Sequence, residues 1–245
     1  MSDLTSSIRE RYLRTLDKIA ASARKAGRPP ESVRLVVVIK TQPLEVIQAA
    51  IEAGAHILGE NYAEEAAQKI AELAPQSAVE WHMIGHVQSR KAQLVAEYFA
   101  LVHSLDGLKL AERLDRSAAK VGRVLPVLLE LNVGGEESKH GWEAADEAHW
   151  PDLLTDMKAV AALPSIKVRG LMSMPPLSTD PEAARGYFKK LRRLRDFLSG
   201  RVPQADWQEL SMGTSADYMV AVEEGATLVR VGQAIVGPRP QTENR

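Results

Sequence analysis

Cysteine is absent from the 245 residues, and its absence excludes disulfide bonds, thiolate metal ligands and cysteine nucleophiles. An excess of either charge is also missing, because 31 Lys and Arg residues offset 32 Asp and Glu residues and leave a formal net charge of -1. Without a strong basic field, we expect no binding to nucleic acid or to an anionic membrane surface. No apolar run approaches the roughly 20 residues of a membrane span, and the first residues have no basic-then-apolar leader. These features predict a soluble, cytoplasmic protein.

Several catalytic motifs are missing as well. The sequence contains no GxGxxG fingerprint, no Walker-type phosphate loop and no GxSxG elbow, so dinucleotide, P-loop and esterase chemistry are not expected. His82 and His86 have a spacing found among metal ligands, but they span a predicted strand and its exit rather than one face of a helix. We therefore predict no metal site. Glu136 and Glu137 are interpreted as solvated side chains of a polar loop rather than as paired acids.

One buried strand ends in a lysine, at residues 35–40. The run Leu-Val-Val-Val-Ile before Lys40 is apolar and mostly β-branched, which is typical of a strand buried on both faces. Pro43 follows and suits the first turn of a helix. Ligands bind at the C-terminal ends of strands in parallel α/β folds, and burial there would lower the pKa of the lysine and supply a neutral amine for Schiff-base chemistry. The alternative interpretation is that Lys40 marks only the point where the strand meets solvent.

Strands and helices alternate along the chain. Apolar residues at steps of three and four predict a leading amphipathic helix over about residues 4–26, which Gly27 ends. About eight strands then alternate with helices, without a Gly/Ser linker or a shift in composition. This pattern predicts one α/β domain over residues 1–245, with a (β/α)8 TIM-type barrel at about 33–240 behind the extra N-terminal helix. The predicted strands cover residues 35–40, 55–59, 81–84, 100–103, 124–132, 166–172, 207–211 and 226–231. The predicted helices include residues 44–51, 60–73, 89–98, 107–120 and 150–163, and a helix capped by Thr214 or Ser215.

Two loops near the C-terminus have the composition of a phosphate site. In such barrels the common phosphate site lies in the loops after the last two strands, where backbone N–H groups meet the anion. Here those loops are Ser211–Ser215 and Arg230–Gln233, in which glycines permit a close backbone approach and hydroxyl groups donate hydrogen bonds. A phosphate clamp opposite the Lys40 amine predicts a phosphorylated aldehyde or ketone as the ligand. Pyridoxal 5'-phosphate (PLP) is one such molecule, and an aldolase substrate is another.

Seven short strings of residues carry a family resemblance. They are KTQP at 40–43, GENY at 59–62, HMIGHVQS at 82–89, GEESKHG at 135–141, RGLM at 169–172, LSMG at 210–213 and SAD at 215–217. In their order and spacing, from the leading helix to about Gly237, these strings resemble the pyridoxal phosphate homeostasis protein family, also called the YggS/PROSC family. That family is similar to the barrel domain of bacterial alanine racemase standing alone.

The resemblance implies a PLP site and a role for each of seven residues. Members of the family bind PLP through an internal aldimine and are taken to buffer or deliver the cofactor rather than turn over a substrate. By this resemblance Lys40 would form the Schiff base, Asn61 would lie near the cofactor ring and Arg230 would face the pyridine nitrogen. The phosphate would be held by the remaining four residues, which are Ser211, Gly213, Gly232 and Gln233. The resemblance also implies a monomer whose partners would be PLP and PLP-dependent apoenzymes.

The sequence departs from the family pattern at four positions. Gln233 stands where Thr or Ser is usual, and Thr214 stands where Met is common. Ile39 and Gln42 stand where Ser and Lys are frequent. The change at Gln233 removes a hydroxyl group from the phosphate loop but leaves the backbone N–H available.

The implied position of Arg230 indicates how reactive the ring of bound PLP would be. A guanidinium stays protonated in proteins, so beside the pyridine nitrogen it keeps that nitrogen unprotonated and weakens the ring as an electron sink. Two-base racemisation also needs a second acid/base, which in the similar racemases is a tyrosine from a separate β domain that we do not expect in this chain. The leading hypothesis is therefore reversible PLP binding without substantial turnover.

Two enzyme classes remain as alternatives. A PLP-dependent amino-acid racemase or lyase would use the same lysine, with His86, His140 or the loop acids as a base. A class I aldolase-like barrel would use Lys40 without a cofactor, and the purified protein would then be colourless.

Overall fold

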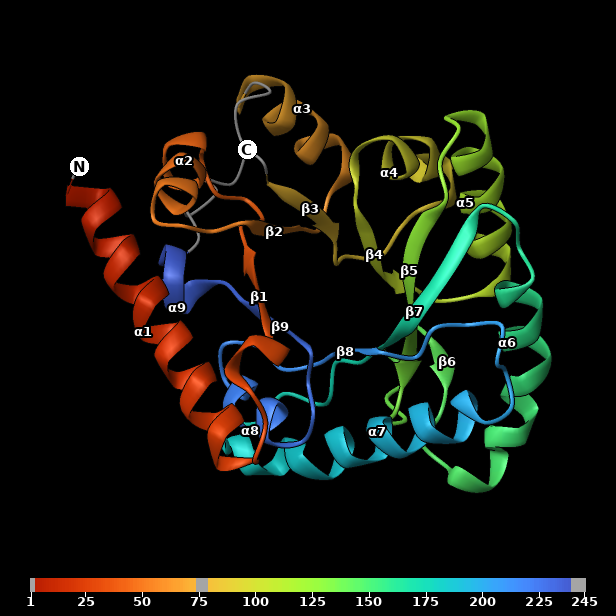
Figure 1. Cartoon of the computed structure of the whole chain (residues 1–245). Helices are drawn as coiled ribbons and strands as arrows, with labels where there is room; N and C mark the ends of the chain where they lie inside the picture. Colours follow the sequence, from red (N-terminus) through yellow and green to blue (C-terminus); the bar gives the residue numbers. More distant parts are fainter. Residues whose placement is uncertain (1–2, 74–78, 239–245) are drawn as a thin grey trace.

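Eight parallel strands close into a barrel in the computed structural model, which describes residues 3–73 and 79–238. The strands follow the order β4-β3-β2-β1-β9-β8-β7-β5, and pairing between β4 and β5 closes the ring. Figure 1 looks into this ring, with the helices around its outside. The predicted TIM-type barrel is confirmed. The barrel strands are β1 (Arg34–Val38), β2 (Ile57–Glu60), β3 (Glu80–Met83), β4 (Leu101–Leu105), β5 (Leu125–Asn132), β7 (Ile166–Met172), β8 (Glu209–Ser211) and β9 (Leu228–Val231).

Helices connect the strands and cover the outside of the barrel. They bury the outward-facing apolar side chains of the strands, so a parallel sheet of this kind needs apolar residues on both faces. The α-helices are α1 (Asp3–Lys25), α2 (Leu44–Glu52), α3 (Ala63–Leu73), α4 (Ala92–Tyr98), α5 (Leu108–Lys120), α6 (Leu154–Ala161), α7 (Arg185–Ser199), α8 (Tyr218–Glu223) and α9 (Gln233–Val236). Short 3-10 helices lie at η1 (Pro30–Ser32), η2 (Ser89–Lys91), η3 (Glu147–Leu153) and η4 (Pro181–Ala184).

The leading helix α1 packs against α2, α8 and α9, beside the strands β1 and β9 (Figure 1). Its apolar residues Ile8, Ile19 and Ala23 are buried in the core, as the helical spacing predicts. The Nε atom of Arg11 donates a hydrogen bond of 2.6 Å to the carbonyl oxygen of Ile235 in α9. Arg28, just after the helix, donates to the carbonyl oxygen of Val222 in α8 at 2.7 Å. The first segment of the chain therefore joins the last two helices of the barrel.

Alternation along the strands directs one set of side chains into the barrel. The middle of the interior holds a separate apolar cluster of Val36, Leu101, Leu128, Met172 and Leu228. Below it, at the N-terminal ends of the strands, charged residues line a hollow of about 180 Å³. Above it, at the C-terminal ends, lies the larger cavity described in the next section. The lining of the lower hollow includes Arg34, Glu80, Arg169 and Glu209.

Four elements differ from the sequence predictions. The predicted helix over 89–98 begins as η2 and becomes α-helical only at Ala92. The strand β1 ends at Val38, because the chain turns after Ile39, so Lys40 lies beyond the strand rather than at its last position. The predicted helix over 150–163 begins as η3 and becomes α-helical only at Leu154, since Pro151 cannot donate a backbone hydrogen bond. A two-residue strand, β6 (Trp142–Glu143), pairs with β5 outside the ring and was not predicted. Residues 239–240 of the expected barrel lie outside the described residues.

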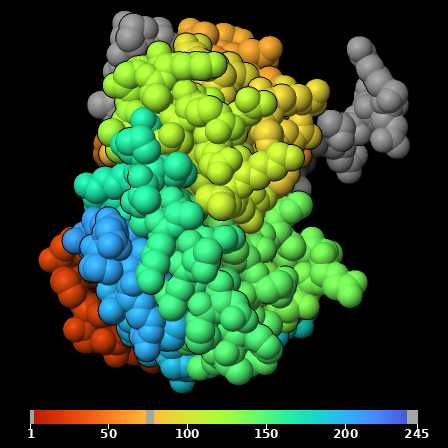
Figure 2. All heavy atoms as spheres, turned by 90° about the vertical axis from the view of Figure 1, so that its right-hand side faces the viewer, coloured from red at the N-terminus to blue at the C-terminus, as the bar shows by residue number. Residues whose placement is uncertain are grey.

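The helices α5, α6 and α7 form one outer face of the molecule. Figure 2 shows this face, with the yellow-green residues of α5 above the green residues of α6 and the light blue end of α7 beside them. The ring of Trp150 lies 5.7 Å from the ring of Phe197, measured between centroids, and joins η3 to α7. Within the described part of the chain, no helix has both the length and the apolar character needed to cross a membrane.

Candidate functional site

A cavity of about 420 Å³ opens at the C-terminal ends of the barrel strands. It has the size and the mixed lining of a small-molecule site, and it lies at the end of the barrel where such sites occur. Of the seven residues predicted for the site, it brings together Lys40, Asn61, Arg230, Gly232 and Gln233. Ser211 and Gly213 are instead buried beside Arg230. Further lining residues are Val38, Ile84, His86, Glu130, His140, Met174, Leu177, Thr214 and Ser215.

Lys40 lies in a tight turn that follows β1. The N–H of Ile39 still bonds to the carbonyl oxygen of Gly59 in β2 at 3.0 Å, and the N–H of Gln42 then bonds back to the carbonyl oxygen of Ile39 at 3.1 Å. Thr41 adopts a φ of 59°, a left-handed conformation that costs a β-branched residue free energy and is concentrated at functional sites. Lys40 itself is half-buried and lines the cavity.

Asn61 is fixed by the end of β2. Its backbone N–H donates a hydrogen bond of 2.7 Å to the carboxylate of Glu60, which is fully buried. Lys69 of α3 forms an ion pair with the same carboxylate, and this pairing compensates for the burial of the charge. The position of Asn61 at the cavity wall is therefore set by a buried ion pair behind it.

The turn after β8 places two hydroxyl groups on the cavity. The N–H of Thr214 donates to the carboxylate of Asp217 at 2.6 Å, while its carbonyl oxygen accepts the N–H of Tyr218 at 2.9 Å. These bonds fix the shape of the turn. The helix α8 begins at Tyr218 with Asp217 at its N-cap and without a side-chain capping hydrogen bond, so the predicted cap at Thr214 or Ser215 is wrong. Gly213 has a φ of 91°, and a Cβ atom there would lie 2.5 Å from the Cβ of Ala221, so only glycine fits this position. Ser215, which belongs to the predicted phosphate loop but not to the seven residues implied by the resemblance, is exposed and lines the cavity.

The turn after β9 lies next to the turn after β8. The backbone N–H of Gly232 donates to the Oγ of Ser215 at 3.3 Å. A Cβ atom on Gly232 would lie 3.2 Å from both the Cβ and the carbonyl oxygen of Val38, so a side chain there would crowd β1. Gln233 is exposed beside it. The two turns together present backbone N–H groups and hydroxyl groups to one side of the cavity.

Arg230 brings a buried cation to the bottom of the cavity, and it is 4% exposed. Its Nη2 donates to the carbonyl oxygen of Ser173 at 3.0 Å, and its Nη1 donates to the Oγ of Ser211. Burial lowers the pKa of Arg230 to about 10, so the guanidinium remains protonated at neutral pH. The predicted phosphate ligand Ser211 is thus a partner of the guanidinium, with its hydroxyl fully buried.

Glu130 is a cavity residue that sequence reasoning missed. Burial, and secondarily the negative charge of Asp106, raise its pKa from 4.5 to about 7. Its place on β5 is a possible signal, because the alternation that turns Leu128 into the barrel turns Glu130 inward as well. A carboxyl group that titrates near neutral pH therefore faces the same cavity as Lys40 and Arg230.

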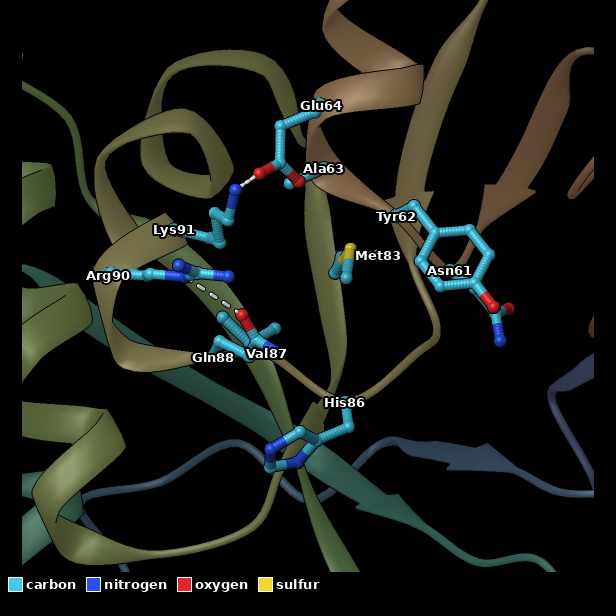
Figure 3. A pocket seen from close by; sticks show the side chains of 10 residues that line it. All are labelled: Asn61, Tyr62, Ala63, Glu64, Met83, His86, Val87, Gln88, Arg90 and Lys91. Atoms are coloured by element: carbon cyan, nitrogen blue, oxygen red, sulfur yellow. Dashed lines mark hydrogen bonds and ion pairs between the residues drawn. The ribbon is translucent and has the colours of Figure 1, made fainter. Parts of the chain in front are cut away.

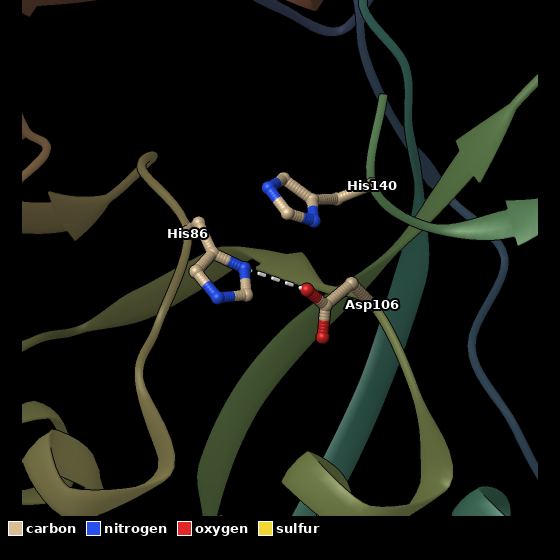
Figure 4. A group of neighbouring side chains, drawn as sticks. All are labelled: His86, Asp106 and His140. Atoms are coloured by element: carbon tan, nitrogen blue, oxygen red, sulfur yellow. Dashed lines mark hydrogen bonds and ion pairs between the residues drawn. The ribbon is translucent and has the colours of Figure 1, made fainter. Parts of the chain in front are cut away.

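His86, Asp106 and His140 gather at the mouth of the cavity (Figure 4). The Nδ1 of His86 and a carboxylate oxygen of Asp106 are 2.8 Å apart, so the carboxylate orients the imidazole. The potential ligand atoms of the three residues lie within 4.8 Å of one another. However, the rings of His86 and His140 are stacked, with centroids 4.2 Å apart and planes inclined by 17°. Because the lone pairs of nearly parallel rings do not converge on one point, this arrangement does not form a tetrahedral metal site without a ring rotation.

A second pocket of about 490 Å³ adjoins the cavity and shares Asn61 and His86 with it (Figure 3). Arg90 donates to the side chain of Gln88 at 3.0 Å, and Lys91 pairs with Glu64. Only the charge of Lys91 is neutralised by an acid in this pocket, because the partner of Arg90 is a neutral amide.

Comparison with known proteins identifies the family. The model of the alanine racemase N-terminal domain matches residues 14–240. The pyridoxal phosphate homeostasis protein of Vibrio alginolyticus is 40% identical over 237 residues, which cover 96% of this chain and 98% of that protein. The chain belongs to the pyridoxal phosphate homeostasis protein family. The protein of that name from Escherichia coli K12 is 38% identical over 229 residues, covering 91% of this chain and 93% of the relative.

Solved structures of the family share the fold. PipY of Synechococcus elongatus PCC7942, solved with PLP bound, is 36% identical, with a TM-score of 0.77 over 94% of this chain and all of that chain (100%). Alanine racemase of Clostridium difficile has a TM-score of 0.68 at 13% identity, and it matches 98% of this chain but 59% of its own. At that identity the likeness shows the barrel fold alone. The predicted membership of the pyridoxal phosphate homeostasis protein family is confirmed.

Proposed function

We propose that the chain binds PLP in the 420 Å³ cavity, holds it reversibly on Lys40 and serves to buffer or deliver it. The observation that carries this proposal is that Lys40 and Arg230 line one cavity together with the two hydroxyl- and glycine-containing turns. The PLP bound to PipY, a relative at 36% identity, supports the same ligand. When bound, PLP supplies an aldehyde that a lysine amine can capture as a Schiff base with the loss of one water.

The donor set of the cavity fits the chemistry of PLP. A phosphate needs several N–H and O–H donors, which the turns containing Ser215 and Gly232 provide. The close approach of Gly232 to Val38 would crowd a side chain there, and glycine keeps this backbone accessible. The guanidinium of Arg230 at the bottom of the cavity matches an unprotonated ring nitrogen as acceptor. We therefore assign the phosphate to Thr214, Ser215, Gly232 and Gln233, and the ring to Asn61 and Arg230.

Ser211 and Gly213 take indirect roles in this proposal. The carbonyl oxygen of Gly213 accepts a hydrogen bond of 3.0 Å from the backbone N–H of Arg230. The Oγ of Ser211 accepts a hydrogen bond from the guanidinium of the same residue. Both residues then act through Arg230 and through the shape of the turn.

The environment of Arg230 favours binding over turnover. A protonated guanidinium beside the ring nitrogen leaves the ring without the positive charge that stabilises a substrate carbanion. The proposed role is therefore PLP homeostasis in the cytoplasm by one monomeric domain, with PLP-dependent apoenzymes as recipients.

Trapping with borohydride tests the Lys40 assignment. The holo protein is reduced, digested and analysed by mass spectrometry, with Lys40→Ala as the matched control. We expect one phosphopyridoxyl adduct, on Lys40, and no yellow colour in the variant. An unmodified Lys40 in a yellow protein would contradict the proposal.

One observation favours an amino-acid racemase or lyase as the second candidate. The Asp106 carboxylate orients the His86 imidazole at the cavity mouth, as a carboxylate orients a catalytic base. Steady-state assays with a panel of amino acids separate the two functions. Turnover well above that of free PLP, lost in His86→Ala, would favour the enzyme.

A further inference from the structure

A chain of polar side chains, buried except for the exposed Glu80 at its lower end, crosses the barrel interior below the cavity. The Nδ1 of His82 lies 2.9 Å from the Nε2 of His103, and the Nδ1 of His103 lies 2.7 Å from the Oγ of Ser211. The same Oγ contacts the guanidinium of Arg230. At the other end, the Nε2 of His82 lies 3.4 Å from the carboxylate of Glu80. These residues come from β3, β4, β8 and β9, so the chain spans the barrel.

The two ends of this chain, together with the burial of His82, favour one direction for its hydrogen bonds. Arg230 is only a donor, so the Ser211 oxygen accepts from it and directs its own hydrogen to the Nδ1 of His103. A neutral His103 then carries its proton on Nε2 and donates to the Nδ1 of His82. His82 in turn donates from Nε2 to Glu80, whose carboxylate is only an acceptor. Donors and acceptors therefore match at every step when both imidazoles are neutral and protonated on Nε2. The reverse direction would require Ser211 to accept two hydrogen bonds and His82 to be an imidazolium, which its burial disfavours.

The surroundings keep both imidazoles neutral. Burial lowers the pKa of His82, and it lowers the pKa of His103 well below its usual range. Other charged groups near the chain are Arg34 and Glu209 of the lower hollow, and Arg230 at its upper end. The hydrogen bond from His82 lowers the pKa of Glu80, which keeps that residue an acceptor.

The position of these polar groups calls for a functional reason. The interior beside them is filled by Val36, Leu128 and Leu228, and apolar side chains would pack there without the desolvation of polar atoms. A fully satisfied buried network fixes the orientation of its members. The member that reaches the cavity is Arg230.

We propose that Glu80, His82, His103 and Ser211 form a directed hydrogen-bond chain that positions the Arg230 guanidinium toward the ring of the bound ligand. His82, His103 and Ser211 are then positioning residues, and Glu80 fixes the chain at the opposite end of the barrel. The proposal rests on the proposed PLP site, because it assigns the ring of PLP to Arg230. It also predicts that Ser211 acts on the ring and not on the phosphate.

The hydrogen-bond direction can be tested in the full-length protein without PLP. Long-range 1H–15N NMR spectra distinguish the two neutral tautomers of histidine from the imidazolium. We expect His82 and His103 as Nε2–H tautomers that remain neutral at the usual histidine pKa of about 6.5. A His103 protonated on Nδ1, or an imidazolium at either position near pH 6.5, would overturn the chain whether or not PLP binds.

The positioning role is tested by ligand titrations of the wild type and of Ser211→Ala, His103→Phe and the double variant. Each single variant should raise the Kd for PLP about tenfold, and the Kd for pyridoxal, which lacks the phosphate, by the same factor. Because residues of one network are not additive, the double variant should bind no more weakly than either single one. The absorbance of bound PLP should also titrate at a shifted pH in all three variants.

Two further variants complete this test. His103→Gln retains one acceptor and one donor and should recover most of the affinity. Ser117→Ala removes a buried serine on α5, outside the barrel interior, and should bind as the wild type does. The proposal would be overturned if the Kd increases of the two single variants multiplied in the double variant. It would also be overturned if Ser211→Ala weakened the binding of PLP but not that of pyridoxal. A wild type that binds neither ligand would instead refute the proposed PLP site. The NMR spectra of the two histidines would still show whether the hydrogen-bond chain has the proposed direction.

Discussion

Gly85 lies against the backbone of Asn61. A Cβ atom at position 85 would come within 2.6 Å of the Asn61 carbonyl oxygen and 2.7 Å of its Cα, distances that no ordinary packing allows. Because backbone atoms and not a flexible side chain are in the way, the segment after β2 must shift if Gly85 is replaced. The lack of a side chain after β3 thus decides where Asn61 stands at the cavity wall.

Gly85→Ala should therefore weaken both the fold and ligand binding. We expect a loss of about 2 kcal/mol in the free energy of unfolding, within the range for overpacked sites, and weaker PLP binding. Urea unfolding and a PLP titration measure the two effects. Gly186→Ala is the matched control, because nothing lies within 4 Å of a Cβ in that helix, and the change should stabilise α7 slightly. Equal stability of the two variants would contradict the prediction.

Glu130 should make the stability of the apo protein depend on pH. Its pKa is about 7 in the folded state against 4.5 for the free group, so the folded state binds the proton more tightly than the unfolded state. Stability should then fall as pH rises from about 4.5 to about 7, by an upper limit of about 3 kcal/mol. Glu130→Gln should flatten this part of the profile. The test is urea unfolding at several pH values, and parallel profiles for the two proteins would refute the assignment.

Ser215 should bind the phosphate of PLP and not its ring. Ser215→Ala removes a hydroxyl group that lines the cavity beside Gly232, so we expect the Kd for PLP to rise about tenfold, equivalent to about 1.4 kcal/mol. The Kd for pyridoxal should not change. The same titration of Ser211→Ala supplies the contrasting case, and a loss of pyridoxal affinity in Ser215→Ala would contradict the phosphate role.

The stacked rings at the cavity mouth should bind zinc weakly. The planes of His86 and His140 are nearly parallel, so we expect Zn²⁺ to bind with a Kd weaker than about 10 μM, equivalent to about −7 kcal/mol. Isothermal titration of the apo protein measures this, with His140→Ala for comparison. Tight binding of one equivalent that is lost in His140→Ala would show that the rings rotate into a metal site.

The parts of the site that were predictable depend on local sequence. The apolar run before Lys40 predicts a buried strand, and Pro43 predicts the start of α2, because strand burial and helix initiation are set by neighbouring residues. Glycine at 213 and 232 likewise indicates close backbone approaches. The barrel followed from the alternation of such segments.

The parts that were not predictable depend on how deep a residue lies in the barrel and on contacts between residues that are distant in the sequence. Ser211 and Ser215 look alike in the sequence, yet Ser211 lies on β8 inside the barrel and Ser215 lies in the turn above it. The left-handed conformation of Thr41 has no signal in a residue type that disfavours it. The contact of His82 with His103 arises only when β3 and β4 pair.

The cavity is closed by strands from the two ends of the sequence. Lys40 follows β1 and Arg230 lies on β9, and these neighbouring strands pair with each other. During synthesis, the amine proposed to capture the ligand leaves the ribosome long before the turns proposed to hold its phosphate. A nascent chain therefore has no assembled site. Ligand binding would indicate that β9 has already paired with its neighbours in the barrel. Such long-range closure also predicts slow folding, and a ligand bound at the junction would keep the ring from reopening.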